Sequence, residues 1–380
     1  MLGTFSAWRL GTLQARALPL AIALRGLGVR SAIVTVPWDR PSERGVIDSI
    51  SGIPVVNTRA VSPALAALAM AEQRATLRAL RPRLVHVFKP KGFGGFTAAL
   101  ERSVPLLVDA DDWEGDGGWN RQGSYSVLQR RLFDRQERRL QRDADGVTAA
   151  STLLTHRARQ LRAHRHPESV YHLPNGLPSE WFTQLRDAGM QREVSDPHAN
   201  RRIVLYSRFA EFADDWLSRF AVELDGHLLS RVELCVVGET TDQLTGIGFE
   251  FLEVNQLGYV ARNQLPHVLG SSCIAVFPFD DSLVTRSKNS VKLLELMAAG
   301  CAVVATDTGD IARTLGAAGV LVSGSDPAVM ADEVARLLDN STARSAHAAL
   351  GPRRVQAQFL IEKTAATLRH VYERHVASWS

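Results

Sequence analysis

Cysteine is scarce in this chain of 380 residues, and its scarcity excludes a disulfide-stapled fold. The three cysteines, Cys235, Cys273 and Cys301, are too few and too far apart for a disulfide framework. None of them stands in the C-x-x-C spacing that structural zinc sites use. Free thiols persist in reducing compartments, so we expect a cytoplasmic protein.

Long apolar runs are also missing, which excludes a transmembrane helix. No stretch approaches the roughly 18 uninterrupted apolar residues that a spanning helix needs. The apolar run near the start, LPLAIAL at 18–24, ends at Arg25, and no cleavage site follows it closely. We therefore expect an amphipathic first helix rather than a signal peptide.

Apolar residues make up 45% of the chain and charged residues 22%, a composition that is ordinary for globular proteins. Disordered and collagen-like chains are excluded on this ground. At roughly 100–200 residues per domain, the length predicts two or three domains.

The net charge of +4 is unevenly distributed along the chain. Residues 1–190 hold 26 Lys or Arg and 17 Asp or Glu, whereas the remainder holds 18 and 23. The basic segments 74–83, 130–142 and 159–166 could attract anionic lipid head groups, which would place the protein peripherally at the inner face of the membrane. The alternative is a set of solvated arginine-rich helices. We expect no nucleic-acid partner, because no nucleic-acid-binding module is recognisable.

Short apolar runs alternate with helical patterns along the whole chain, which predicts an α/β fold with parallel sheets. Strands are predicted at 31–37, 84–88, 105–110, 146–151, 202–207, 232–238, 273–279, 301–307 and 319–323, and helices at 63–80, 126–142 and 353–376.

The polar stretch between the two series of strands predicts a domain boundary. We expect a Rossmann-like domain over 1–186, a linker at 187–201, and a second Rossmann-like domain over 202–352. A C-terminal helix over 353–380 would return to the first domain. Two doubly wound domains that face a cleft bind ligands at the carboxyl ends of their strands.

The stretch PFDDSLVTRSKNSVKLLELMAAGCAVVATDTGD at 278–310 predicts an anion site. A strand ends at Phe279, and a polar loop with Arg286 and Lys288 follows it. Asn289 or Ser290 can cap a helix over 291–299, which ends at Gly300. Free N–H groups at the start of a helix, next to two cations, suit a diphosphate.

This stretch also resembles a known family. LLELMAAGCAVVATDTGD is similar to the donor-binding segment of family 4 glycosyltransferases, which have the GT-B fold. RIVLYSRF at 202–209, LGYV at 257–260 and HLPNG at 172–176 match other segments of that family in the right order. In the first half, 16–37, 81–90 and VDADDW at 108–113 fit the acceptor domain.

The resemblance implies roles for individual residues. Glu295 would bind the ribose, Arg208 would contact the donor diphosphate, and Tyr259 and Val260 would lie at the nucleotide base. Ser290 and Val291 would begin the helix beneath the phosphates, beside Arg286, Lys288 and Lys292. Independently of the resemblance, Gly11 lies in the loop 3–12, which follows a short strand expected at the start of the chain, and would let the backbone approach the ligand closely.

Two departures from the family pattern concern charge at the donor site. The first glutamate of the family's pair is replaced by Ser287, and the lysine that usually follows the arginine is missing from RFAEFADDW at 208–216. We therefore expect Lys288 or Lys292 to supply the second cation that stabilises the leaving diphosphate. As alternatives, Glu295 and Lys292 form a solvated pair on a helix, Arg208 is a surface residue and Tyr259 belongs to the core.

On the acceptor side, VDADDWEGDGG at 108–118 places several carboxylates after a predicted strand. One interpretation is a divalent metal site of the GT-A kind. A second, which we favour, is the family 4 arrangement, with Asp111 in the place of a histidine and Asp112 in that of an aspartate. The third is a solvated acidic loop. We expect no metal cofactor.

The sequence therefore predicts a glycosyltransferase that moves a sugar from a nucleotide-diphosphate donor, with retention, to a small-molecule, lipid-linked or glycan acceptor. Asp111, Asp112, Arg208 and Lys288 are its candidate catalytic residues. The alternative is a non-catalytic GT-B protein that binds a nucleotide or a protein partner. A nicotinamide dehydrogenase is disfavoured, because no G-x-G-x-x-G follows a strand and opens a helix.

Overall fold

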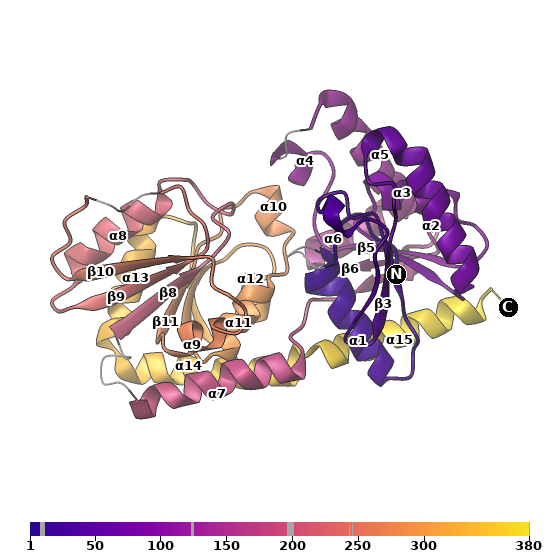
Figure 1. Cartoon of the computed structure of the whole chain (residues 1–380). Coiled ribbons are helices and arrows are strands. Elements are labelled where there is room, and N and C mark those ends of the chain that lie inside the picture. Colours follow the sequence, from indigo (N-terminus) through magenta and orange to yellow (C-terminus); the bar gives the residue numbers. More distant parts are fainter. Residues whose placement is uncertain (8–11, 123–124, 196–200, 243, 245, 380) are drawn as a thin grey trace. The chain divides into compact units, whose positions relative to one another are not determined.

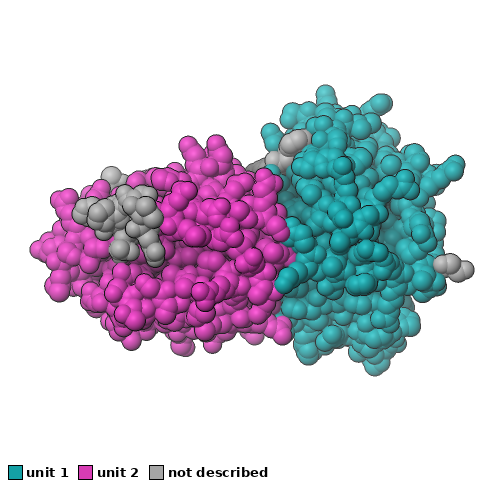
Figure 2. Space-filling model, turned by 90° about the horizontal axis from the view of Figure 1, so that it is seen from below, with its two compact units in different colours: residues 1–175, 287–289, 361–380 teal, residues 176–286, 290–360 magenta. Residues whose placement is uncertain are grey.

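The computed structural model describes residues 1–7, 12–122, 125–195, 201–242, 244 and 246–379 (Figure 1). The chain divides into two compact units, which Figure 2 colours separately. Unit 1 contains residues 1–175, 287–289 and 361–380, and unit 2 contains residues 176–286 and 290–360. Both are α/β units with parallel sheets, as the alternation of strands and helices predicts.

Unit 2 is built on a parallel sheet of six strands in the order β10-β9-β8-β11-β12-β13. Its strands are β8 (Arg202–Tyr206), β9 (Val232–Val237), β10 (Leu252–Gly258), β11 (Ile274–Phe277), β12 (Ala302–Thr306) and β13 (Gly319–Val322). Its helices are α7 (Ser179–Ser195), α8 (Trp216–His227), α9 (Leu265–Gly270), α10 (Leu283–Arg286), α11 (Val291–Ala298), α12 (Ile311–Leu315), α13 (Pro327–Asp339) and α14 (Ser341–Gln358). The strand order reverses direction at β8 and β11, the kind of point where doubly wound sheets bind ligands.

The apolar runs of unit 2 form strands because both faces of the sheet are covered. Val204 and Ala275 belong to a core cluster that includes residues of α7, α9 and α11. Their neighbours Ile203 and Ile274 belong to a second cluster that includes residues of α8 and α13. Figure 1 shows these two sets of helices on opposite faces of the sheet. Alternate residues of each strand therefore lose water on opposite sides, which explains the continuous apolar runs.

Unit 1 contains a parallel sheet in the order β4-β5-β6-β7 and a smaller sheet in the order β1-β3-β2, in which β2 is antiparallel. Leu2 forms parallel bridges to both Val34 and Val87, and so joins the two sheets. The strands are β1 (Ile33–Thr35), β2 (Ile47–Ile50), β3 (Ile53–Asn57), β4 (Val85–Phe88), β5 (Leu106–Ala110), β6 (Gly146–Ala149) and β7 (Val170–His172). The helices are α1 (Leu18–Gly26), α2 (Ala66–Leu80), α3 (Gly92–Leu100), α4 (Trp119–Gln122), α5 (Val127–Asp143), α6 (Thr152–Leu161) and α15 (Ile361–Ala377).

The last helix of the chain belongs to unit 1. Helix α15 packs beside α1, as Figure 1 shows, and its Leu368 shares a buried cluster with Leu20 of α1. The Tyr372 hydroxyl, also on α15, lies 2.8 Å from Nδ1 of His86 in β4. Burial lowers the pKa of His86 to about 3, so its imidazole is neutral and links α15 to β4 as an uncharged hydrogen-bonding group.

The structure confirms all nine predicted strands within a few residues, and it adds β2, β3, β7 and β10. Strand β10 reads LEVNQLG and lies at an edge of its sheet, so it lacks the apolar run of a central strand. Strands β2 and β3 form an antiparallel pair, and β7 is short.

Two segments differ from the sequence prediction. Residues 187–195 of the expected linker continue α7, while 196–200 lie outside the described residues. Helix α7 packs against α9 and α11 of unit 2, so its tertiary contacts outweigh its polar composition. The single helix expected over 353–376 is interrupted at Phe359 and Leu360, where Leu177 donates its N–H to the Phe359 carbonyl. Among the described residues, no helix combines the length and apolar character that crossing a bilayer requires.

Candidate active site

The carboxyl ends of the unit 2 strands carry most of the residues predicted for donor binding. Arg208 follows β8, and Tyr259 and Val260 follow β10. Arg286 follows β11 on the short helix α10, and Ser290 immediately precedes α11. Because all six strands are parallel, these segments lie along one edge of the sheet.

Arg208 lies in a tight loop that a buried carboxylate organises. Its Nε donates to Oε1 of Glu211 at 3.2 Å, and the same carboxylate accepts from the Ser207 hydroxyl and the Ala210 N–H. Glu211 is buried, whereas the Arg208 side chain is 54% exposed. Glu211 thus holds the guanidinium at its Nε, and the exposure of the side chain allows an anion to approach it.

The backbone of this loop is unusual at Phe209, which has a φ of 58°. A residue with a side chain holds this left-handed conformation only where its surroundings fix it, at a cost of roughly 1–3 kcal/mol. Gly238, which follows β9, provides the space, because a Cβ there would lie 2.1 Å from the Ser207 carbonyl oxygen. Close packing of the two strand ends therefore sets the position of Arg208.

Helix α11 begins where the sequence predicts, at Val291, with Ser290 as its N-cap residue. The Ser290 side chain makes no capping hydrogen bond, so the first N–H groups of the helix are not satisfied by it. Gly300 follows the helix with a φ of 69°, as a C-terminal glycine should. The uncapped start of α11 retains the features of an anion site.

Glu295 is buried in the interior of unit 2, with 4% of its surface exposed. Nε1 of Trp181 donates to its Oε1 at 2.8 Å, and the Tyr206 hydroxyl also hydrogen-bonds it. Burial raises the pKa of Glu295, against the opposing effects of the Trp181 N–H and of the positive charges on Arg262 and Lys292. The interpretation of Glu295 and Lys292 as a solvated helical pair is therefore wrong for Glu295.

Other residues predicted for the donor site have the following surroundings. The Lys292 ammonium lies 3.7 Å from the centre of the Tyr206 ring. Arg286 is half-exposed, and its Nε lies 3.7 Å from Oδ1 of Asp281. Tyr259 is 66% exposed, which rules out the alternative that it belongs to the core, and Val260 packs partly against the core. Gly11 lies outside the described residues.

Lys288 belongs to unit 1 rather than to unit 2. Its ammonium lies 5.0 Å from the centre of the Trp119 ring, a cation–π distance. The next residue, Asn289, accepts a hydrogen bond from the Asn175 N–H and another, through its carbonyl, from the Asn175 side chain. These contacts explain why residues 287–289 group with unit 1, although the segments on either side of them belong to unit 2.

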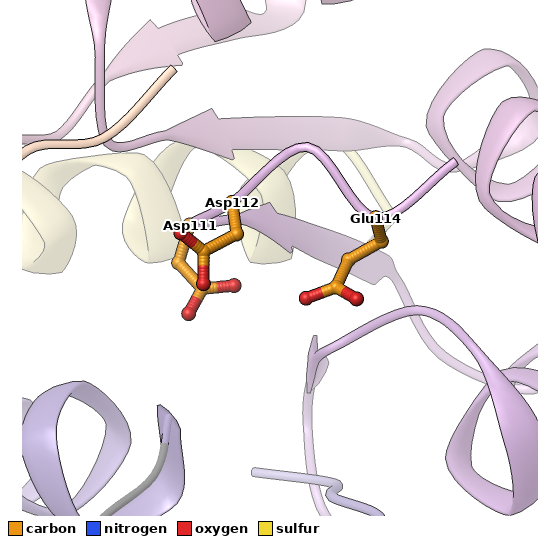
Figure 3. Close-up of side chains that lie close together, drawn as sticks. All are labelled: Asp111, Asp112 and Glu114. Carbon is orange, nitrogen blue, oxygen red and sulfur yellow. The ribbon is translucent and has the colours of Figure 1, made fainter. Parts of the chain in front are cut away.

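The carboxyl end of β5 in unit 1 carries three neighbouring carboxylates (Figure 3). Asp111, Asp112 and Glu114 each turn an oxygen toward the others, and these atoms lie within 4.8 Å of one another. Oxygen atoms so arranged can hold a divalent ion. However, Lys89 forms ion pairs with both Asp112 and Glu114, and Lys91 pairs with Glu114. The residues present therefore form a mixed network of charges rather than a purely anionic metal cage.

The two lysines change the protonation of this network. Although burial alone would raise it, the ammonium groups of Lys89 and Lys91 hold the pKa of Glu114 below its ordinary value. The carboxylates in turn raise the pKa of Lys89 well above its usual range, overcoming the effect of its burial. Glu114 and Lys89 thus remain charged at neutral pH.

Asp111 behaves differently from its neighbours. Its Oδ2 accepts from the Thr12 hydroxyl at 2.6 Å, while its Oδ1 is buried and lacks a hydrogen-bond partner among the described residues. Burial raises its pKa to about 7; Asp112, Asp109 and Glu114 add to this effect, whereas Lys89 opposes it. A carboxyl group with such a pKa exchanges its proton near neutral pH, as a general acid or base must.

A deeper set of buried polar residues supports this loop. Arg16 forms a two-point ion pair with Asp109 at 2.7 and 2.8 Å, and it also donates to Asn175. On the other side, Glu137 accepts from the Glu114 N–H and pairs with Arg157, whose guanidinium lies 3.9 Å from the centre of the Trp113 ring. The acidic loop is therefore held at both ends by buried ion pairs, and the interpretation of a merely solvated loop is wrong.

Comparison with known proteins bears on both units. Residues 11–176 match the model of a glycosyl transferase 4-like domain, and residues 200–340 match that of glycosyl transferases group 1. Together the two matches cover most of the chain. The chain belongs to the family 4-like glycosyltransferases.

Solved structures of low sequence identity share its fold. A sucrose-phosphate synthase from Thermosynechococcus elongatus is 18% identical, with a TM-score of 0.73 over 99% of both chains. Anabaena HepE, solved with UDP and glucose, is 16% identical, with a TM-score of 0.67 over 98% of this chain and 99% of that one. A trehalose 6-phosphate synthase from Burkholderia multivorans is 13% identical, with a TM-score of 0.67 over 100% of this chain and 99% of that one.

No curated protein matches the sequence. The fold is the GT-B fold, and the chain is a glycosyltransferase enzyme.

Several residues that shape the site of this glycosyltransferase are absent from its sequence motifs. Trp181, Lys91 and Glu211 contact predicted site residues or their neighbours, yet none belongs to the segments that carry the family resemblance, and Lys89 lies in one of them without an assigned role. Lys89 and Lys91 follow a predicted strand, and that position was a usable signal. Trp181 lies far from Glu295 in the sequence, so only the tertiary structure reveals their contact.

Proposed function

We propose that unit 2 binds the donor as a nucleotide-diphosphate sugar. The observation that carries the proposal is that Arg208, the uncapped start of α11 and the segment containing Glu295 belong to the carboxyl-end side of one parallel sheet. HepE, which shares the fold, was solved with UDP-glucose and with UDP and glucose, which supports UDP-sugars as the first donors to test.

In the proposed reaction, the bond between the sugar and the diphosphate breaks while the acceptor hydroxyl forms a new bond to the same carbon. Negative charge then gathers on the departing diphosphate. Arg208 and the N–H groups of α11 would stabilise that charge, because they are fixed in place before the reaction. Within unit 2, Lys292 of α11 is our candidate for the missing second cation.

We further propose that unit 1 binds the acceptor near Asp111 and Asp112. A carboxyl group with a pKa of about 7, as in Asp111, suits a hydrogen bond to an acceptor hydroxyl that loses its proton. Retention of anomeric configuration follows from the family resemblance, with the leaving diphosphate receiving that proton.

A binding screen followed by a turnover assay tests the donor proposal. UDP, GDP, ADP and their glucose conjugates are each added to the protein, and the melting temperature is recorded. One of these nucleotides and its glucose conjugate should raise the melting temperature increasingly with their concentration. A ligand that binds the native state raises the free energy of unfolding of the protein. The stabilising sugar donor should then be consumed when simple glycoside acceptors are present. Lack of stabilisation by any nucleotide contradicts the donor proposal, whereas binding without hydrolysis or transfer favours a non-catalytic GT-B protein.

We also propose that unit 1 contacts anionic membranes through α5. Val127 and Leu128 at its start are 66% and 77% exposed, and exposed arginines follow at positions 130, 131, 135, 138, 139 and 142. Exposed apolar residues beside a row of arginines suit the boundary between lipid head groups and acyl chains.

Vesicle sedimentation tests this contact. The protein should pellet with phosphatidylglycerol vesicles and remain in solution with phosphatidylcholine vesicles, because arginines near an anionic surface each contribute about 1 kcal/mol. Leu128→Glu should abolish pelleting. Leu229→Glu, at a 90% exposed position of unit 2, is the matched control and should change nothing. Equal pelleting by the wild type and Leu128→Glu would contradict the assignment of α5.

A further inference from the structure

Trp181 is a buried residue of unit 2 that the family motifs do not include. It lies near the start of α7, with 6% of its surface exposed, and belongs to the same core cluster as residues of α9 and α11. Its indole N–H donates to Oε1 of Glu295 at 2.8 Å. Packing alone does not require a hydrogen bond from the indole nitrogen to a carboxylate, so this contact requires a separate explanation.

The surroundings of Glu295 explain what this N–H accomplishes. A carboxylate that is 4% exposed loses most of its hydration, which favours the protonated form. The groups that face it are Trp181 from α7, Tyr206 from β8, Lys292 from its own helix and Arg262 from the segment before α9. Arg262 lies 4.1 Å from the centre of the Trp181 ring, and Lys292 lies 3.7 Å from that of Tyr206. Each aromatic ring that hydrogen-bonds Glu295 is therefore itself held by a cation.

The geometry also limits how the carboxylate can turn. A carboxylate offers about four lone-pair positions on two oxygens. The Trp181 N–H is a donor only, so it always requires an oxygen opposite it. Because Oε1 is committed to Trp181, a ribose must find its acceptor among the remaining positions. The indole thus decides which side of Glu295 is available to a ligand.

We propose that Trp181 is a positioning residue that orients Glu295 toward the ribose hydroxyls of the bound nucleotide, and that it thereby sets the preference for ribonucleotides over deoxyribonucleotides. This inference rests on the proposed function, since it requires a nucleotide in unit 2. A site built to hydrogen-bond a hydroxyl discriminates strongly against an analogue without it, because its buried polar groups are then left unpaired.

The test compares UDP with 2′,3′-dideoxy-UDP by calorimetric titration. The wild type should bind UDP at least about 10-fold more tightly, the effect of one hydrogen bond to a charged group. Trp181→Phe should weaken UDP binding about 10-fold and leave the affinity for dideoxy-UDP within about a factor of two. Trp216→Phe is the matched control, because Trp216 is also a buried side chain whose indole donates a hydrogen bond, to the Ser325 carbonyl, away from Glu295. A general loss of packing would weaken both nucleotides equally and would overturn the proposal.

Glu295→Gln provides a second measurement that does not depend on removing the tryptophan. In this variant the Trp181 N–H should keep the oxygen of the new amide opposite itself, which turns the amide NH₂ group toward the ribose. The amide NH₂ can still donate to a ribose oxygen, but as a neutral group it binds more weakly than the carboxylate, so Glu295→Gln should lose part of the UDP affinity that Glu295→Ala loses in full. In the double variant Trp181→Phe/Glu295→Gln the Tyr206 hydroxyl can donate to or accept from the amide in either orientation, so the amide can turn and UDP affinity should partly recover. A Glu295→Gln enzyme that keeps the wild-type preference for UDP would overturn the proposal even if Trp181→Phe fails to fold.

The outcomes distinguish this inference from the proposed function. If the wild type binds UDP and Glu295→Ala abolishes the preference while Trp181→Phe does not, only the role of Trp181 falls. If Glu295→Ala leaves the preference unchanged, the assignment of Glu295 to the ribose falls with it. If no nucleoside diphosphate binds at all, both the donor proposal and this inference are wrong.

Discussion

Replacing Arg208 by alanine is expected to lower the rate of sugar transfer by about 10²–10³-fold, the usual cost of removing one fixed donor from a developing negative charge. Donor binding should weaken much less, because the interaction strengthens as the diphosphate leaves. The measurement is single-turnover transfer at saturating donor, with the melting temperature recorded for each variant. Arg219→Ala, at an exposed position of α8, is the control and should match the wild type.

Glu211 refines this prediction, because its carboxylate holds the Nε of Arg208. Glu211→Gln keeps the size of the side chain but removes its charge, so the guanidinium should lose part of its fixed orientation. We expect an intermediate loss of rate, of about 10-fold. The assignment of Arg208 to the leaving diphosphate would be untenable if Arg208→Ala transferred sugar within about threefold of the wild-type rate, less than the smallest loss expected for one such donor.

Replacing Lys89 by methionine is expected to lower the free energy of unfolding of unit 1 by about 3–5 kcal/mol at pH 8. Lys89 is 14% exposed and pairs with Asp112 and Glu114, so its removal leaves Lys91 to balance a larger negative charge in this buried network. It also holds a φ of 60°, a conformation that the surrounding contacts must maintain. Urea unfolding monitored by circular dichroism measures the loss. Lys363→Met, at an exposed position of α15, is the matched control.

The loss should depend on pH in a defined direction. Because the pKa of Asp111 is raised to about 7, this group keeps its proton in the folded state at pH 5 and has released it at pH 8. When an acid has a higher pKa in the folded than in the unfolded protein, the free energy of unfolding falls as the pH rises from the unfolded-state pKa to the folded-state pKa. The destabilisation by Lys89→Met should therefore be smaller at pH 5 than at pH 8. Adding Asp111→Asn should recover part of the loss at pH 8. Equal destabilisation at both pH values would show that Asp111 carries no charge at pH 8.

Much of the fold was predictable because its signals are local. The buried strands of the parallel sheets read as apolar runs, since both faces lose water, and helix α11 is bounded by recognisable end signals. The edge strand β10 and the second half of α7 escaped prediction for the opposite reason. Their residues are polar, and contacts with distant segments decide their conformation.

The donor-site prediction shows the same division. The resemblance of several segments, in the right order, to family 4 glycosyltransferases was enough to indicate a GT-B glycosyltransferase, and the comparisons confirm that family. The sequence did not indicate that Glu295 is buried or that Trp181 and Tyr206 hold it. Nor did it indicate that Lys288 lies with unit 1, where it contacts the Trp119 ring.

The sequence by itself determined which apolar segments become buried strands, which helix begins beside a basic loop, and which family the chain belongs to. The first two properties depend on residues close together in the sequence, and the third on the order of short segments along it. Only the tertiary structure decided the protonation of Asp111 and the pairing of Lys89, Lys91, Trp181 and Glu211 with their partners. Those properties depend on burial and on distances between residues far apart in the sequence, and the energy of a charge is set by both.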